Sequence, residues 1–287
     1  YRIFDSYRNM YWPNGQKIIA AAQHVAHTDG LYAVYLSNFR CGPDSFILHY
    51  VGEELKNKPF LHLEVDEHSA DAGMVTRIEA FLDSLKGAEI NKGKDIKVLR
   101  PRKAASPPDS KRTLYFPYMH DGAYMIAAAA RSAGIPSEVL PKQTDEDIAI
   151  GRKYTSSKEC FPMICTTGSF IKKLMEPGSD PSRMSFFMPD HNGPCRFGQY
   201  NHLQRIIFDR LGFGDAELVT PSNETSYADL AGEKSQLFRI NAWKGFVAFD
   251  FLRKIYRETK PYEISKGETQ TLYEASLRKI EKCIESG

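Results

Sequence analysis

Apolar runs alternate with amphipathic helix patterns along most of the chain. The run at residues 31–36 is followed by apolar residues at helical spacing from Phe46 to Leu55, and the run at 60–65 precedes a predicted helix over about 76–85. Continuous apolar runs are typical of strands buried on both faces of a parallel sheet. The pattern therefore predicts repeated strand, loop and helix units of the α/β class.

The second half follows the same order. Strands are predicted at 113–118 and 185–188, a small-residue helix over 122–132, and a longer amphipathic helix from about residue 200. One more strand is predicted at 96–99. Apart from the strand at 96–99, each predicted strand is short and is followed by a helix, as parallel sheets with crossover helices require.

We predict an α/β fold with two doubly wound, Rossmann-like domains, mainly parallel sheets and a C-terminal helical segment. The first domain covers 1–105, the second covers 106–222, and the helical segment 223–287 is expected to pack across both domains. Residues 100–112 contain three prolines and mixed charge without periodicity, so they are predicted to be a linker between the domains.

The amino-acid composition excludes some classes of binding partner. The 287 residues contain 38 Lys and Arg against 36 Asp and Glu, a net charge of +2, so no basic face for nucleic acid is predicted. No apolar run approaches the roughly 20 residues that span a bilayer, so no membrane partner is expected. Five cysteines, an odd number, do not suggest a disulfide framework, and we expect a cytoplasmic location. The chain begins at Tyr1, and we expect it to be part of a longer protein or a processed chain.

Three cysteines share one local pattern. Cys41, Cys160 and Cys195 each lie within two residues of a proline and before an amphipathic helix pattern, and Cys195 lies in a turn flanked by Gly193 and Gly198. Any one of them alone is better explained as a small buried side chain. Together they favour convergence at the carboxyl edge of a parallel sheet, where helix N-termini lower thiol pKa values. Three thiolates leave a coordination position open, unlike a closed four-cysteine site.

Other chemical groups are open to two interpretations. Cys165 is a further candidate ligand for which core packing is favoured, and Cys283 is interpreted as structural. Polar residues also stand at predicted strand ends, namely Asp66, His68 and Asp71, then His120 and Asp121, then Asp190 and His191. Helix capping is favoured for the first group, while catalytic and structural roles both stay open for the histidines of the other two. No nucleotide-binding loop or serine-hydrolase motif is present.

Four segments carry a resemblance to a known family. Residues 41–46, 60–77, 159–162 and 193–200 closely resemble the 2-hydroxyacyl-CoA dehydratase/benzoyl-CoA reductase-like family. Within it, the chain is most similar to the uncharacterised non-ATPase region of large CoA-substrate-specific enzyme activases. The resemblance extends over roughly residues 1–220, and the activase ATPase motifs are missing from this chain.

The resemblance implies Rossmann-like domains that hold an iron-sulfur cluster, commonly 4Fe-4S, through Cys41, Cys160 and Cys195, and it offers no matching role for Cys165. It implies an ATPase partner of the acetate kinase/Hsp70 type, expected in the same full-length chain. That partner would supply a low-potential electron for radical dehydration or reduction of an acyl-CoA in anaerobic metabolism. Such a cluster is readily lost during purification in air. Whether the chain is itself a lyase or reductase component stays open. The alternatives are a non-catalytic electron-transfer or docking module, and a scaffold without metal.

Overall fold

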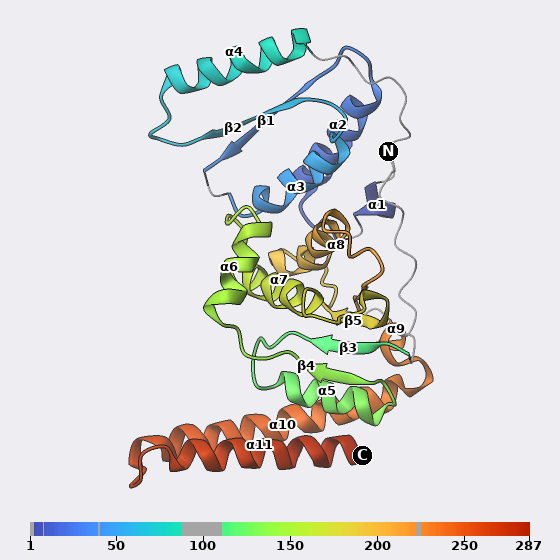
Figure 1. Cartoon of the computed structure of the whole chain (residues 1–287), viewed down its shortest axis with the longest axis vertical. Coiled ribbons are helices and arrows are strands. Elements are labelled where there is room, and N and C mark those ends of the chain that lie inside the picture. Colours follow the sequence, from blue (N-terminus) through green and yellow to red (C-terminus); the bar gives the residue numbers. More distant parts are fainter. Residues whose placement is uncertain (1–2, 8, 40, 88–110, 222–224) are drawn as a thin grey trace. The chain divides into compact units, whose positions relative to one another are not determined.

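The structure is a computed structural model of the chain that describes residues 3–7, 9–39, 41–87, 111–221 and 225–287 (Figure 1). The fold is α/β with two parallel sheets, as predicted. The chain forms two compact units. Unit 1 comprises Tyr1–Arg102, Thr155–Phe161 and His191–Leu203, and unit 2 comprises Lys103–Tyr154, Pro162–Asp190 and Gln204–Gly287. Short segments from the second half of the sequence therefore belong to unit 1, and the predicted three-part division stays a prediction.

Unit 1 is built around two parallel strands. In β1 (Ala33–Asn38) and β2 (Phe60–Val65), Ala33 is opposite Phe60 and Asn38 is opposite Val65. Its helices within the described residues are α1 (Ile3–Ser6), α2 (Pro13–His27), α3 (Asp44–Glu54) and α4 (Asp71–Gly87). Helices α2 and α3 pack against each other, and the buried side of α3 includes Phe46, Ile47, Tyr50 and Val51.

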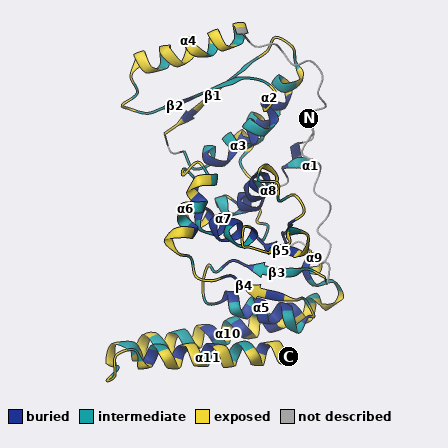
Figure 2. Ribbon diagram, viewed as in Figure 1, coloured by how far each residue is buried: buried dark blue, intermediate teal, exposed yellow. Residues whose placement is uncertain are grey.

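The burial of β1 differs from the prediction. Val34 and Leu36 are exposed to 54% and 65%, whereas Tyr35 and Ser37 are buried (Figure 2). The covered face is turned toward α3, because the Tyr35 hydroxyl donates to Asp44 Oδ1 over 2.8 Å. The interpretation of residues 31–36 as a strand buried on both faces was therefore wrong, since the described residues cover only one face.

Unit 2 contains a four-stranded parallel sheet in the order β4-β3-β5-β6. The strands are β3 (Thr113–Phe116), β4 (Ser137–Val139), β5 (Met184–Phe187) and β6 (Glu217–Val219). The helices on this part of the chain are α5 (Ala123–Ser132), α6 (Asp145–Tyr154), α7 (Phe161–Leu174), α8 (Tyr200–Arg210), α9 (Ala228–Ala231), α10 (Ser235–Thr259) and α11 (Glu268–Ser286). The first residues of α7 and α8 belong to unit 1.

A layer of small side chains forms the centre of unit 2. Helix α5 lies between strands β3 and β4 and the pair α10 and α11 (Figure 1). Its residues 127–130 are four alanines with no exposed surface, which lets the helices approach closely. Helices α5 and α10 lie so close that a Cβ added to Gly245 of α10 would lie 2.9 Å from Met125 Cβ of α5. Gly134 ends this layer at a φ of +86°, a conformation that favours glycine.

Several predicted elements are confirmed. The strand at 60–65 coincides with β2, the helix at 122–132 matches α5 within one residue, and most of the segment after 223 is helical. Its packing across both domains stays a prediction. Helices α10 and α11 pack against α5 and each other, and α10 also contacts α9 and the 3-10 turns on either side of it. The predicted strand at 96–99 and nearly all of the linker lie outside the described residues. Strands β4 and β6 were missed because each has only three residues.

Candidate functional site

One face of α3 organises the candidate site in unit 1. Phe46, His49 and Tyr50 follow one another at helical spacing, and each contacts a segment from the second half of the sequence. Cys41 lies just before this helix, between the end of β1 and Asp44, where its carbonyl accepts from the Ser45 amide over 3.2 Å. Helix α3 thus carries the first cysteine at its start and the contacts to the other two along its side.

The segment carrying Cys160 is held by a buried carboxylate. Glu159 accepts from His49 Nε2 over 2.6 Å, and from the Ser156 amide and the Lys158 amide over 3.1 Å each. Burial alone would raise the pKa of Glu159, but the hydrogen bonds from His49 and Ser156 hold it below its ordinary value. Lys158 also pairs with Glu64 of β2 at 2.8 Å. Cys160 therefore has a fixed backbone position beside α3 and β2.

The segment carrying Cys195 is held by two contacts with α3. The Tyr50 hydroxyl donates to the Gln199 backbone carbonyl over 3.2 Å, and the rings of Phe46 and Tyr200 stack with centroids 6.0 Å apart. Gly198 permits this path, because a Cβ there would lie 2.1 Å from the His191 carbonyl oxygen. The expectation of a turn that excludes side-chain bulk around Cys195 fits this close approach.

Two polar side chains, Arg196 and Tyr200, each border two of the three cysteine segments. Arg196 follows Cys195 directly, and a Cβ on Gly42 would lie 3.4 Å from its guanidinium carbon, which places that side chain against the backbone next to Cys41. The Tyr200 hydroxyl hydrogen-bonds Cys160, and its pKa is raised by burial, by this bond and by the charges of Cys160 and Cys195. Cys41, Cys160 and Cys195 thus belong to one unit and one neighbourhood.

The electrostatics of Cys41 differ from the expectation. Its pKa is raised, mainly by burial and also by the Asp44 side chain, while the charge of Arg196 and a backbone hydrogen bond oppose the shift. The expected lowering of thiol pKa by a helix N-terminus is therefore wrong for Cys41, because burial of the thiol, together with the Asp44 side chain, raises its pKa. A bound cation would reverse this balance by favouring the thiolate.

All five cysteines are free thiols. Cys41 and Cys160 are half-buried and Cys195 is exposed. Cys165 lies in α7 within unit 2, half-buried and with a pKa raised by burial and by Asp147. Cys283, interpreted from the sequence as structural, is exposed on α11. Across the described ranges, no three His, Cys, Asp or Glu side chains stand close enough to hold one metal ion.

The polar residues after β2 are used to shape a turn. Asp66 Oδ1 accepts from the His68 amide and the Ser69 hydroxyl, both over 2.9 Å, just before α4 begins. The favoured structural interpretation of Asp66 fits this arrangement, although it closes a turn and does not cap the helix itself. Asp190, another polar residue predicted at a strand end, donates its backbone amide to the Pro221 carbonyl over 2.9 Å.

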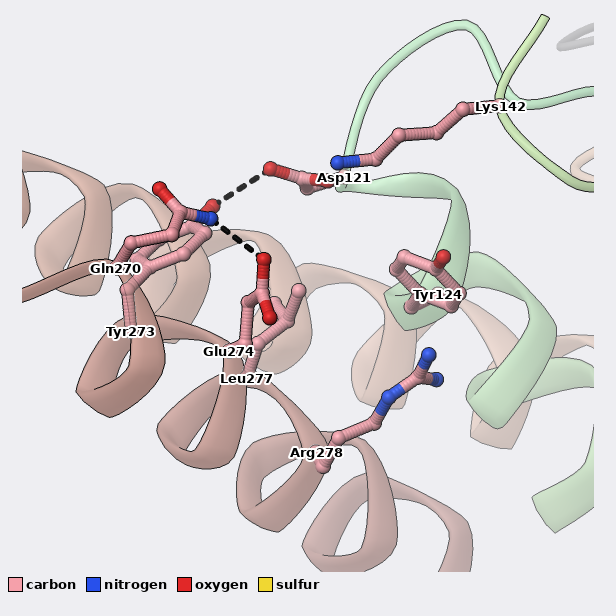
Figure 3. Close-up of a pocket in the computed structure, with 8 residues that line it drawn as sticks. All are labelled: Asp121, Tyr124, Lys142, Gln270, Tyr273, Glu274, Leu277 and Arg278. Carbon is pink, nitrogen blue, oxygen red and sulfur yellow. Dashed lines mark hydrogen bonds between the residues drawn. The ribbon is translucent and has the colours of Figure 1, made fainter. Parts of the chain in front are cut away.

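A second candidate lies in unit 2, where His120 and Asp121 follow β3. Asp121 accepts from the Tyr118 hydroxyl over 2.5 Å. It also accepts from the Tyr273 hydroxyl over 2.8 Å (Figure 3). Burial alone would raise its pKa, but the two hydroxyls and the Lys142 charge lower it overall. His120 packs edge-on against Phe249, with ring centroids 4.8 Å apart. Both residues therefore tie the end of β3 to the C-terminal helices.

Asp121 lines a cavity of about 230 Å³ between α5, the loop after β4 and α11 (Figure 3). Two cations border it, but both lie on aromatic rings: Lys142 is 5.4 Å from the Tyr118 centroid, and Arg278 is 4.5 Å from that of Tyr124. Arg278 also pairs with Glu281 at 3.0 Å. Because its charged groups are already engaged with aromatic rings, hydroxyl groups and Glu281, this cavity is better explained as a contact between structural elements than as a binding site.

Sequence reasoning missed His49, Arg196 and Tyr200 as parts of the site. Arg196 and Tyr200 lie in the segment that carries the family resemblance, but their polar atoms gave no reason to single them out. The helical spacing of Phe46 and Tyr50 could have indicated that His49, which lies between them, is also on the buried side of α3. Its partner Glu159 is 110 positions away, a pairing that no local pattern reveals.

None of the helices in the described part of the chain has the length and apolar character needed to cross a bilayer. Comparisons of the chain with protein-family models, with curated proteins and with solved structures find no match.

Proposed function

We propose that unit 1 binds an iron-sulfur cluster through Cys41, Cys160 and Cys195. On this proposal the chain is a component of an ATP-dependent, low-potential system that dehydrates 2-hydroxyacyl-CoA or reduces acyl-CoA. The observation that carries it is that α3, which begins beside Cys41, holds the Cys160 and Cys195 segments, both more than a hundred residues further along the chain. Arg196 borders Cys41 and Cys195, and Tyr200 borders Cys160 and Cys195. Family resemblance supports the assignment but rests on the same segments.

The residue types fit an anionic sulfur-rich group. Thiolates are the usual ligands of iron-sulfur clusters, and the Arg196 guanidinium would offset part of the negative charge near Cys41. The Tyr200 hydroxyl already makes a hydrogen bond with the Cys160 side chain. Hydrogen bonds to ligand sulfurs are one of the factors that set the reduction potential of a cluster. In a multi-iron cluster each thiolate binds a different iron, so its ligands stand further apart than those around one ion. When bound, the cluster would supply one-electron chemistry.

This chain's own residues would prepare and enclose the site. His49 and Glu159 hold the Cys160 segment, and Gln199 holds the Cys195 segment, so the ligands would be presented by a fixed backbone. Three protein ligands would leave a position for substrate or water. An acyl-CoA substrate, and an ATPase of the acetate kinase/Hsp70 type elsewhere in the full-length protein, complete the proposed system.

The finer fold assignment is part of this proposal. We infer that the sheet of unit 2 is doubly wound, because its order reverses direction at β3, with β4 on one side and β5 on the other. Five free thiols also favour a reducing, cytoplasmic location.

A second candidate function is electron transfer or docking without turnover. The exposure of Cys195 favours it, because a cluster held partly at the surface can exchange electrons with a partner. An acyl-CoA that changes the spectrum of the reduced cluster supports the catalytic proposal. An unchanged spectrum with every acyl-CoA tried favours the transfer module.

Anaerobic reconstitution tests the shared basis of both functions. Iron and sulfide are counted on the wild type and on Cys41→Ser, Cys160→Ser and Cys195→Ser variants, with electron paramagnetic resonance of the reduced samples. We expect stoichiometric iron and sulfide in the wild type, a strong loss in each variant, and wild-type loading in the control Cys283→Ser. Equal loading of all five proteins, or none in any, contradicts the proposal.

A further inference from the structure

Helix α10 has a continuous row of large apolar side chains on its outer face. We call it the α10 stripe, and its members are Leu237, Ile240, Trp243, Val247, Phe251 and Ile255. Their exposed fractions run from 40% to 71%, with Trp243 the most exposed. Exposed segments recur along α10 (Figure 2). The spacing of three or four residues keeps them on one side of the helix over about 27 Å.

The stripe is not the face by which α10 joins its own unit. Phe238, Gly245 and Phe249 are buried and turned toward the core that α10 shares with α5 and α11. A helix that already buries one apolar face in its own unit has no internal need for a second. The exposed fractions correspond to roughly 600 Å², as large as the largest apolar patches on ordinary monomers. The stripe is therefore a candidate interface.

We propose that the α10 stripe binds a second copy of this chain in an antiparallel, two-fold arrangement with Phe251 near the axis. The area argues for it, because a standard interface needs about 800 Å² per partner, and the flanking side chains add to the stripe. In an antiparallel pair, residues equally far from Phe251 in sequence meet across the interface. Val247 then faces Ile255 of the partner subunit, so apolar side chains meet apolar side chains.

The charged residues beside the stripe agree with this register. Lys244 would face Glu258 of the partner subunit, and Lys254 would lie beside Asp250 of the partner subunit. All four side chains are exposed on α10, and Lys254 also lies 4.0 Å from Glu258 of the same helix. At its outer end, Ile240 would meet Tyr262 of the partner subunit, a ring that is 83% exposed just after α10. This axis position pairs Val247 with Ile255 and Lys244 with Glu258, while Trp243 would lie opposite Thr259 of the partner subunit. The apolar and charged pairs favour a second copy over an unrelated occupant.

Sedimentation velocity of the full chain over a concentration series tests the proposal. We expect a dimer in the micromolar range and a dissociation constant weakened about 100-fold by Val247→Glu, because the carboxylate would enter an apolar interface. The matched control is Val75→Glu on α4, since Val75 is 51% exposed and Val247 54%. The control is expected to stay dimeric, and circular dichroism checks that both variants fold.

Charge exchange tests the register. Lys244→Glu alone is expected to weaken the dimer about tenfold, and the double variant Lys244→Glu with Glu258→Lys to restore it. A chain that is monomeric at all concentrations overturns the proposal. So does a dimer indifferent to Val247→Glu. A monomer that binds vesicles of phosphatidylcholine and phosphatidylserine through the stripe would also overturn it, in favour of a lipid surface.

Discussion

The two units use polar side chains differently after their strands. In unit 1, Glu159 and Tyr50 bind loop backbone and leave the cysteine sulfurs accessible to differing extents. In unit 2, Asp121 is bound by two tyrosine hydroxyls, one from α11, and the nearby cations lie on aromatic rings. In unit 1 these hydrogen bonds position the loops that carry cysteines. In unit 2 they join the end of β3 to the C-terminal helices.

The cavity in unit 2 and the candidate cysteine site in unit 1 therefore differ in how far their polar groups are already engaged. The charged groups that line the cavity in unit 2 already contact aromatic rings or hydrogen-bonding side chains, so a ligand would have to displace existing contacts. The thiols of unit 1 have fixed backbones and few competing contacts. Changes in unit 1 should therefore alter thiol chemistry, and changes in unit 2 should alter stability without affecting the thiols.

Glu159→Ala should have the largest effect. It removes the shared acceptor of His49, Ser156 and Lys158, and we expect a loss of about 3 kcal/mol from the free energy of unfolding of unit 1. Urea denaturation measures this loss, and alkylation of Cys160 should become faster. The control is Glu176→Ala, whose carboxylate pairs with Lys173 at the surface. Equal stability of the two variants would show that Glu159 does not hold the loop.

Gly198→Ala should cost nearly as much. The added methyl would meet the His191 carbonyl oxygen at 2.1 Å, so the backbone around Cys195 must shift, at an expected cost of about 2–3 kcal/mol. The matched substitution is Gly214→Ala, where the nearest atom would be a side-chain oxygen at 3.8 Å. Thermal unfolding compares the two, and the prediction fails if Gly198→Ala is as well tolerated as Gly214→Ala.

Asp121→Asn should weaken unit 2 by about 1–2 kcal/mol without changing the alkylation of Cys41, Cys160 or Cys195. The pKa of Asp121 is lowered in the folded state from its ordinary 3.8. The unfolded chain therefore binds more protons in that range, so stability from Asp121 is present above pH 3.8 and is lost as pH falls through the lower folded value. Denaturation at several acidic pH values should show a shallower profile for the variant. An unchanged profile would mean that the two tyrosines do not stabilise the carboxylate.

The smallest predicted effects concern the reactivity of Cys41. Arg196→Ala removes a charge that lowers the Cys41 pKa, so alkylation at fixed pH should slow a few-fold. Asp44→Asn removes a charge that raises it and should speed alkylation by a similar factor. Mass spectrometry of the Cys41 peptide follows both rates. Changes of the same sign in the two variants would refute the electrostatic explanation.

Local pattern predicted the α/β class and several elements, because β2 and α5 have clear periodicity and boundaries. It could not predict that Thr155–Phe161 and His191–Leu203 belong to the first unit, since that depends on pairs such as His49 with Glu159. Likewise, the exposure of Val34 and Leu36 depends on which neighbours cover the sheet. The grouping of Cys41, Cys160 and Cys195 was a sequence hypothesis. The shared neighbours support it, while metal binding stays a prediction.

Residue-resolved protection from alkylation tests the central proposal most directly. The anaerobically reconstituted chain is treated with iodoacetamide, and each cysteine is quantified by mass spectrometry against the metal-free protein. We predict that Cys41, Cys160 and Cys195 become protected together, while Cys283 stays reactive in both samples. Protection of only one or two of the three, or equal labelling with and without reconstitution, would contradict the assignment of one shared cluster site.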